Sequence, residues 1–223
     1  MTITIRPAGP AIDAGLLKRA KRASVPTFGH YIEDGAMDPG IVAQVFPARF
    51  AGRAVTVRTT APDSALVHKA VGLLEEGDVL VVDLGADRLH APVGAVVALA
   101  ASLRGAAAIV IDGPCTDVVQ LREIGLPIFS RGLSCLTTKL HGLDTGSING
   151  AVSCGGVAVR PGDLVMGDEN GVLVIPPAVA AALIDTVLDD DATEPALCAH
   201  LREGARLPDA TGITAMLQER YGL

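Results

Sequence analysis

The sequence predicts an α/β domain, and three observations support this class. Residues 79–83 (VLVVD) and 108–112 (AIVID) are short apolar runs, which is typical of parallel strands that are buried on both faces. Each run follows a helical stretch that ends near a glycine, so strands and helices alternate along the chain. The 223 residues, 49% of them hydrophobic, suffice for one core that buries roughly 70% of the unfolded surface. We therefore expect right-handed crossovers and helices packed on a parallel sheet.

The first quarter of the chain contains two helices, a turn and a strand. Residues 11–23 carry apolar side chains at helical spacing beside a basic face, which predicts an amphipathic helix. The segment SVPT ends it and caps a second short helix through residues 28–32. Residues 38–40 (DPG) predict a turn, and the alternation in 53–59 (RAVTVRT) predicts a half-buried strand.

The middle of the chain supplies the helices that alternate with the strands. Residues 64–74 and the alanine-rich residues 94–104 have helical spacing, and each segment ends near a glycine. A third helix begins at residues 118–123, and residues 126–130 (LPIFS) form the next strand.

The last third of the chain has a different character. Residues 150–175 consist of Val-rich segments joined by Gly-Gly, Pro-Gly and Asn-Gly turns, which predicts a β-meander. Helices are expected at residues 177–188 and 194–204, separated by the acidic run 189–191, and a terminal helix at 211–221. We interpret residues 1–223 as a single domain with N-terminal helices at 11–34, a core at 50–176 and C-terminal helices at 177–221.

Composition excludes several classes of function. The 18 Lys and Arg against 25 Asp and Glu give a net charge of −7, and no basic run occurs, so nucleic-acid binding is not expected. No apolar run approaches the roughly 20 residues of a membrane-spanning helix, and residues 1–10 lack the apolar core of a secretory signal. We expect a cytoplasmic protein without a membrane partner, with its four cysteines as reduced thiols.

Two polar segments follow predicted strands and could carry chemistry. Residues 112–117 (DGPCTD) lie at the carboxyl end of a buried strand and just before a helix, where ligands of α/β sheets bind. Asp117 could hold a divalent cation through its carboxylate or simply cap the helix that follows. Residues 89–96 lead into the helix that starts near Gly94, and the free N–H groups of that helix could bind an anion.

Four segments between about residue 24 and residue 204 form a recognisable set: residues 105–132 and 152–176, which are the most specific, with DPG at 38–40 and EEGDVLVVD at 75–83. They resemble the RraA-like family, which includes class II 4-hydroxy-4-methyl-2-oxoglutarate aldolases, oxaloacetate decarboxylases and RNase E inhibitors. The resemblance implies a swivelling α/β/β domain with a small β-barrel-like core and flanking helices. It also implies a homotrimer or homohexamer whose sites contain Mg²⁺ or Mn²⁺.

The resemblance also assigns roles to individual residues. It implies that Asp117 holds the metal and that the turn Gly94, Ala95, Val96 and Val97 binds a substrate carboxylate through its amides. The family has an acid at the position of Ala95. At the position of Thr116 the family has an arginine that binds the substrate. A hydroxyl cannot replace the forked charge of a guanidinium, so standard aldolase activity is in doubt.

Four further residues lie at positions that the family resemblance singles out, and Ser64 and His30 depart from the family's Asn and Asp there. The resemblance implies that Ser64, in place of an asparagine, and Glu194 act on the waters of the metal. Glu194 would reach the site of a neighbouring subunit. His30 could serve as acid or base, or could be a packed helix-face residue. His68 occupies a position where the family often has histidine.

The sequence leaves three hypotheses about the function of the protein. The first is a divalent-metal-dependent lyase that stabilises an enolate from a small 2-oxo or hydroxy acid, with Arg88, Arg131 or Lys139 replacing the lost charge, or with a changed substrate. The second makes Cys115 a nucleophile activated by a helix N-terminus. The third is a non-catalytic trimer that binds another protein, as the RNase inhibitors do.

Overall fold

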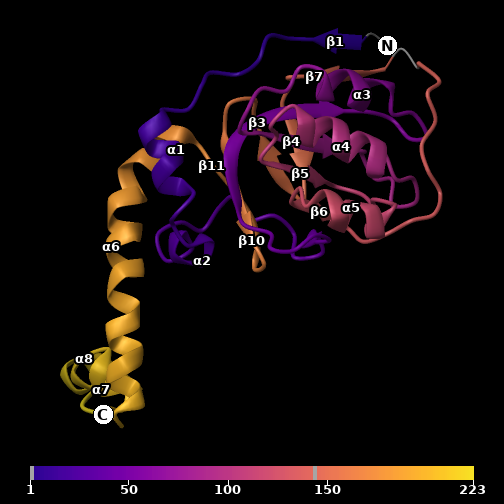
Figure 1. Ribbon diagram of the computed structural model, residues 1–223. Coiled ribbons are helices and arrows are strands. Elements are labelled where there is room, and N and C mark those ends of the chain that lie inside the picture. Colours follow the sequence, from indigo (N-terminus) through magenta and orange to yellow (C-terminus); the bar gives the residue numbers. More distant parts are fainter. Residues whose placement is uncertain (1–2, 143–144) are drawn as a thin grey trace.

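The computed structural model describes residues 3–142 and 145–223, and its centre is a nine-stranded sheet (Figure 1). The strands follow the order β1-β7-β3-β4-β5-β6-β2, and β10 and β11 join the sheet through β3. The four central strands β3 to β6 are parallel, as the sequence predicts. The strands are β1 Ile3–Ile5, β2 Val42–Ala43, β3 Phe50–Arg58, β4 Asp78–Asp83, β5 Ala108–Ile111, β6 Ile128–Ser130, β7 Gly146–Ile148, β10 Leu164–Asp168 and β11 Gly171–Ile175.

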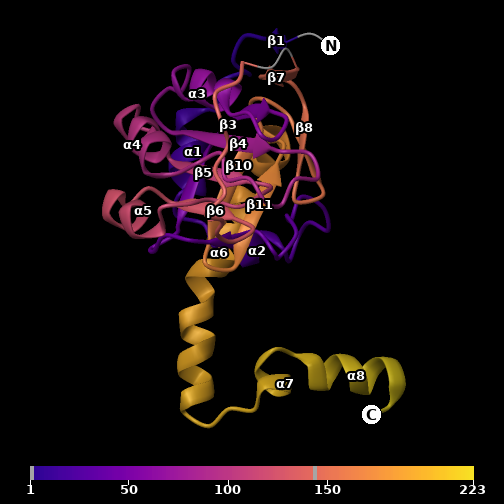
Figure 2. The same ribbon diagram turned by 90° about the vertical axis from the view of Figure 1, so that its right-hand side faces the viewer.

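Three helices cover one face of the parallel strands, as expected from the alternation of the sequence (Figures 1 and 2). They are α3 (Ala65–Val71), α4 (Ala95–Leu103) and α5 (Val118–Ile124). Their inward residues pack on the side chains that point to this face of β3, β4 and β5 in one buried cluster. The fold is therefore a mixed α/β domain with a central sheet and flanking helices.

Two β-hairpins cover the opposite face, where the sequence predicted one continuous meander. Among the described strands, β8 (Val152–Cys154) pairs only with β9 (Val157–Val159) in a separate two-stranded sheet, whereas β10 pairs with β11 and with β3. The prediction of a single meander was wrong because the turn after β9 bonds to β3. The N–H of Gly162 donates to the carbonyl of Ala54, and the N–H of Ala54 donates to the carbonyl of Asp163. The chain therefore enters β10 along the edge of β3 instead of beside β9.

An outer helical layer packs on the β10–β11 hairpin. It consists of α1 (Ala14–Ala20), α2 (Val25–Phe28) and the first half of α6 (Pro177–Arg202). The two helices expected at 177–188 and 194–204 are instead one helix of 26 residues, which runs through the acidic run. Asp191 accepts hydrogen bonds from the N–H of Ser24 and the hydroxyl of Thr27, and Asp190 accepts one from Tyr31. The acidic run therefore attaches α6 to α2 and is not a linker.

The end of the chain projects from this body. The distal half of α6 extends away from the sheet and leads to α7 (Leu207–Ala210) and α8 (Ile213–Tyr221), in which no residue is buried (Figure 2). The expected terminal helix at 211–221 is confirmed as α8. Among the described helices, none combines the length and the apolarity that a membrane crossing requires.

Candidate functional site

The loop between β5 and α5 holds Asp117 in a defined position at the carboxyl edge of the sheet. The N–H of Cys115 donates to the carbonyl of Gly132, and the N–H of Thr116 donates to the carbonyl of Val93, both at 3.0 Å. Asp117 itself adopts the left-handed conformation, with φ 57° and ψ 37°, which aspartate tolerates better than most residues. Asp117, in this strained conformation directly before α5, therefore exposes its carboxylate to solvent.

The carboxylate of Asp117 meets the N-terminus of α4. Its Oδ2 accepts a hydrogen bond of 2.9 Å from the N–H of Ala95, the first residue of the helix. A Cβ at Gly94 would collide with Oδ2 of Asp117 and would lie 2.8 Å from Cγ2 of Thr116. The contact between the two segments therefore requires a glycine at position 94.

A pocket of about 250 Å³ opens between these segments. It contains Asp117, Thr116 and the α4 turn that the sequence selected, together with Ser64 and His68 at the start and middle of α3. The pocket is lined by Ser64, His68, Ala91, Pro92, Gly94, Val96, Val97, Thr116, Asp117, Thr137, Thr138 and Leu140. Ala95 is absent from this lining and contributes its N–H to Asp117. Six of the nine site residues predicted from the sequence therefore line this pocket, while their roles remain predictions.

Two predicted site residues lie elsewhere in the chain. His30 follows α2, is exposed, and donates its backbone N–H to the carbonyl of Thr27. Glu194 is exposed on the distal half of α6. A single chain therefore does not bring either residue into the pocket, and their proposed roles remain predictions about an assembled oligomer.

The sequence analysis missed the segment that closes the pocket from the other side. Thr137, Thr138 and Leu140 reach it because their backbone forms isolated parallel bridges, Thr137 with Ala91 and Lys139 with Asp63. Isolated bridges have no periodic sequence pattern, so only the three-dimensional structure identifies this wall.

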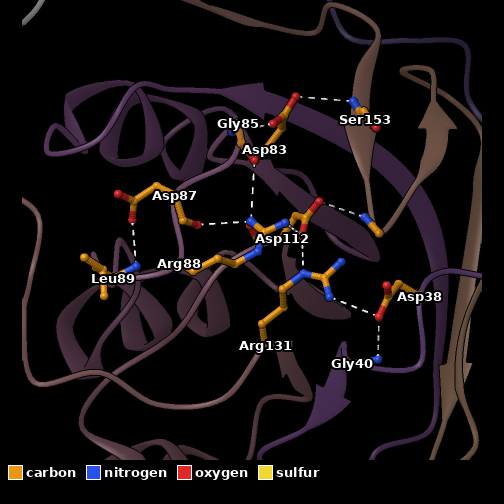
Figure 3. Close-up of polar contacts among 11 residues, drawn as sticks. Asp38, Gly40, Asp83, Gly85, Asp87, Arg88, Leu89, Asp112, Arg131 and Ser153 are labelled. Carbon is orange, nitrogen blue, oxygen red and sulfur yellow. Dashed lines mark hydrogen bonds and ion pairs between the residues drawn. The ribbon is translucent and has the colours of Figure 1, made fainter.

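A second polar cluster lies on the same edge of the sheet, and it uses two of the cations proposed for the pocket (Figure 3). Asp112 is 6% exposed, and its Oδ1 accepts from Nε of Arg131 and pairs with Nη2 of Arg88 at 3.2 Å. Its Oδ2 accepts from the N–H of Gly155 at 3.0 Å. Arg131 also bonds Oδ1 of Asp38 at 3.0 Å. The guanidinium groups of these two arginines are therefore bound within the Asp112 cluster.

The third candidate cation lies beside the pocket wall. Nζ of Lys139 donates to the carbonyl of Thr137 at 2.9 Å, and Thr137 lines the pocket. Lys139 is exposed and is not itself a lining residue.

Cys115 lies at the base of the loop and does not have the properties of a nucleophile. Its side chain is fully buried and its Sγ accepts from the hydroxyl of Ser130 at 3.4 Å. Burial raises the pKa of the Cys115 thiol, with a smaller upward contribution from the charge of Asp117. The thiol is therefore protonated near neutral pH, which is the opposite of the activation that a nucleophilic Cys115 requires.

The donor atoms of the pocket fit a water-rich Mg²⁺ or Mn²⁺ site better than a closed protein cage. Among the described residues, no group of three or more His, Cys, Asp or Glu side chains could hold a metal ion. Asp117 offers one exposed carboxylate, with the hydroxyls of Thr116 and Ser64 in the same pocket. Mg²⁺ is often bound by one or two carboxylates, with waters and substrate oxygens completing its octahedron.

An α/β domain with a ligand-sized pocket at the carboxyl edge of its parallel strands belongs to a class in which such edges bind small molecules. The family model described as "RraA-like: Aldolase/RraA" matches residues 13–174, and the chain therefore belongs to the RraA-like family.

Individual relatives agree with this assignment. A protein of Halalkalibacterium halodurans named "Putative 4-hydroxy-4-methyl-2-oxoglutarate aldolase" is 37% identical over 150 residues, which cover 66% of this chain and 70% of the relative. The RNA-processing inhibitor RraA from Thermus thermophilis is 30% identical with a TM-score of 0.63, covering 69% of this chain and 93% of its own. RraAS2 of Streptomyces coelicolor, described as an unusual member of the RNase ES inhibitor RraA family, is 25% identical with a TM-score of 0.73, covering 84% and 97%.

Proposed function

We propose that the protein is a divalent-metal-dependent lyase that cleaves a carbon–carbon bond of a small 2-oxo or hydroxy acid. The observation that carries this proposal is the pocket in which Asp117, the N-terminus of α4 and His68 come together. The aldolase name of a relative at 37% identity supports the same class of reaction.

Each part of the pocket has a chemical role in this proposal. Mg²⁺ or Mn²⁺ held by Asp117 would supply Lewis-acid polarisation of the 2-oxo group. The N–H groups of Val96 and Val97 are the next ones after Ala95 at the start of α4, and they attract the substrate carboxylate. His68, whose side chain reaches the pocket from α3, can accept the proton that leaves a hydroxyl during cleavage.

Assembly into a trimer or hexamer belongs to the same proposal. Val96, Leu99 and Leu103 follow helical spacing on α4 and are 77%, 49% and 79% exposed, so α4 presents an apolar stripe to its surroundings. The stripe begins at the pocket, because Val96 also lines it. A second copy on this stripe would cover the pocket mouth.

The test is proton NMR in D₂O with Mg²⁺, against oxaloacetate, pyruvate and 4-hydroxy-2-oxo acids, with and without EDTA. We expect cleavage, decarboxylation or deuterium uptake at C3 that EDTA abolishes. If none of the three reactions occurs across the panel, the lyase proposal is wrong.

A non-catalytic binding protein is the second candidate function. It is favoured by the structural likeness to an RNA-processing inhibitor and by Thr116, which supplies no charge to the pocket. A pull-down that recovers one stable protein partner, together with absence of turnover in the NMR panel, would support this candidate over the lyase.

A further inference from the structure

The charge balance of the pocket restricts what the site can accept. Its side chains comprise an apolar group (Ala91, Pro92, Val96, Val97 and Leu140), a hydroxyl group (Ser64, Thr116, Thr137 and Thr138), one histidine and one carboxylate. The formal charge that these side chains contribute is therefore negative, from Asp117.

The two arginines near the pocket are paired with a carboxylate, whereas Lys139 is bound to neutral oxygen atoms. Arg88 and Arg131 both bond Asp112, which takes the guanidinium groups away from the pocket. Lys139 bonds the backbone carbonyl and, at 3.4 Å, the hydroxyl of Thr137. These neutral partners hold its Nζ against Thr137, and Lys139 is not among the lining side chains.

One carboxylate of a substrate still has a site. The N–H of Ala95 is taken by Asp117, and the first hydrogen bond within α4 starts at the N–H of Ala98. This leaves the N–H groups of Val96 and Val97 at the pocket wall, where the positive end of the helix attracts one anion. A metal ion held by Asp117 would also attract the carboxylate and the 2-oxo oxygen at that end of the substrate.

The rest of the pocket suits an uncharged group. The side chains of Val96 and Leu140 are 77% and 65% exposed, and both line the cavity, so they form an apolar mouth. A carboxylate placed there would find no Lys or Arg among the lining side chains, whereas a methyl group would gain apolar contact.

Resting on the proposed lyase function, we propose that the substrate is a monocarboxylic 2-oxo acid whose distal end is uncharged and apolar. In the cleavage of a 4-hydroxy-2-oxo acid, the proton of the C4 hydroxyl goes to a base, the C3–C4 bond breaks, and C4 becomes an aldehyde carbon. The electron pair stays on C3 as the enolate of pyruvate, and C3 then takes a proton. No oxidant or reductant is required.

A matched pair of substrates tests this selectivity with the full chain and Mg²⁺. 4-Hydroxy-2-oxopentanoate and 4-hydroxy-2-oxoglutarate differ only in a distal methyl group against a distal carboxylate, and both release pyruvate, so one coupled assay measures both. We expect kcat/KM to favour the pentanoate by about tenfold or more.

Two variants of one residue sharpen the test. Thr116→Arg places a guanidinium in the pocket, so the ratio of the two kcat/KM values should shift towards the dicarboxylate by about tenfold or more. Thr116→Gln adds a side chain without charge, and its ratio should still favour the pentanoate. A ratio that responds equally to both variants would mean that size, and not charge, sets the preference.

The two proposals fail in distinguishable ways. Equal or better cleavage of 4-hydroxy-2-oxoglutarate by the unmodified protein would overturn the inference and leave the lyase function intact. That result would also show that Lys139 or a neighbouring subunit supplies a cation. If neither substrate releases pyruvate, and pyruvate shows no EDTA-sensitive exchange at C3, both the lyase function and the inference are wrong.

Discussion

Asp112 and Asp117 lie five residues apart on the same loop, yet their surroundings are opposite. Asp112 is 6% exposed and has partners on both oxygens, from Arg131, Arg88 and the N–H of Gly155. Asp117 is exposed, and its main partner is the N–H of Ala95. A saturated carboxylate stabilises a fold, whereas a carboxylate with free lone pairs can bind a cation or substrate. Asp112 therefore has the surroundings of a structural residue, whereas Asp117 has the surroundings of a residue that can bind a ligand.

The largest expected effect is the loss of turnover on changing Asp117. Asp117→Asn keeps a residue that tolerates the left-handed conformation and an oxygen for the N–H of Ala95, but removes the charge. We expect metal-dependent pyruvate release to fall by about 100-fold or more and the melting temperature to change little. Unfolding of this variant, or full activity in it, would contradict the division between the two carboxylates.

The reverse pattern is expected for Asp112. Asp112→Asn removes the buried charge that Arg88 and Arg131 share, and leaves Arg131, which is only 18% exposed, with Asp38 as its remaining carboxylate partner. We expect a loss of about 2–3 kcal/mol in the free energy of unfolding. At fixed protein concentration the melting temperature should fall by roughly 4–12 °C.

The control for this change is Asp34→Asn, which alters an exposed carboxylate and should cost less than about 0.5 kcal/mol. If Asp112→Asn melts like the control, the Asp112 cluster does not stabilise the fold.

A smaller effect on turnover is expected from Gly94→Ala. The added methyl group meets the carboxylate of Asp117 and lies 2.8 Å from Cγ2 of Thr116, so the two segments must separate. We expect kcat/KM to fall by about tenfold, as misplaced catalytic groups cause. Gly72→Ala is the matched control, since its nearest contact is 3.4 Å away and it should leave kcat/KM unchanged. Equal behaviour of both variants would show that Asp117 does not need its position against α4.

The smallest expected effect concerns acid stability at the rim of the Asp112 cluster. The N–H of Gly40, followed by the guanidinium of Arg131, lowers the pKa of Asp38. A lowered pKa in the folded state stabilises the protein above the ordinary aspartate value of about 3.9, and this stabilisation is lost as pH falls through the folded pKa. Asp38→Asn should therefore destabilise slightly at pH 7, with a difference that shrinks below about pH 4 in urea titrations. A difference that grows with acid would have the wrong sign.

The sequence predicted the parallel core because the apolar runs of β4 and β5 and the intervening helices have clear periods. It did not predict β1 and β7, which are three residues each, because their pairing is decided by partners far along the chain. It also divided α6 at Asp189–Asp191, because the charges of this run indicated a linker until their bonds to Ser24, Thr27 and Tyr31 were known.

The candidate site, like the fold, could be predicted from the sequence only in part. Asp117 and Gly94 lie at the ends of regular elements, so their position at the sheet edge could be inferred from the sequence. The wall formed by Thr137 and Leu140 could not, since isolated bridges place it there. The commitment of Arg88 and Arg131 to Asp112 likewise required coordinates.

The saturated bonding of Asp112 has an evolutionary consequence. Asp112 holds the root of the loop, and the backbone N–H of Thr116 bonds the carbonyl of Val93, so neither contact involves the side chain at position 116. A lineage can therefore test arginine, threonine or other residues there at almost constant stability, within the margin that marginally stable proteins allow. Under the proposed function, in which position 116 influences the choice of substrate, this separation would allow new specificities to arise on an unchanged scaffold.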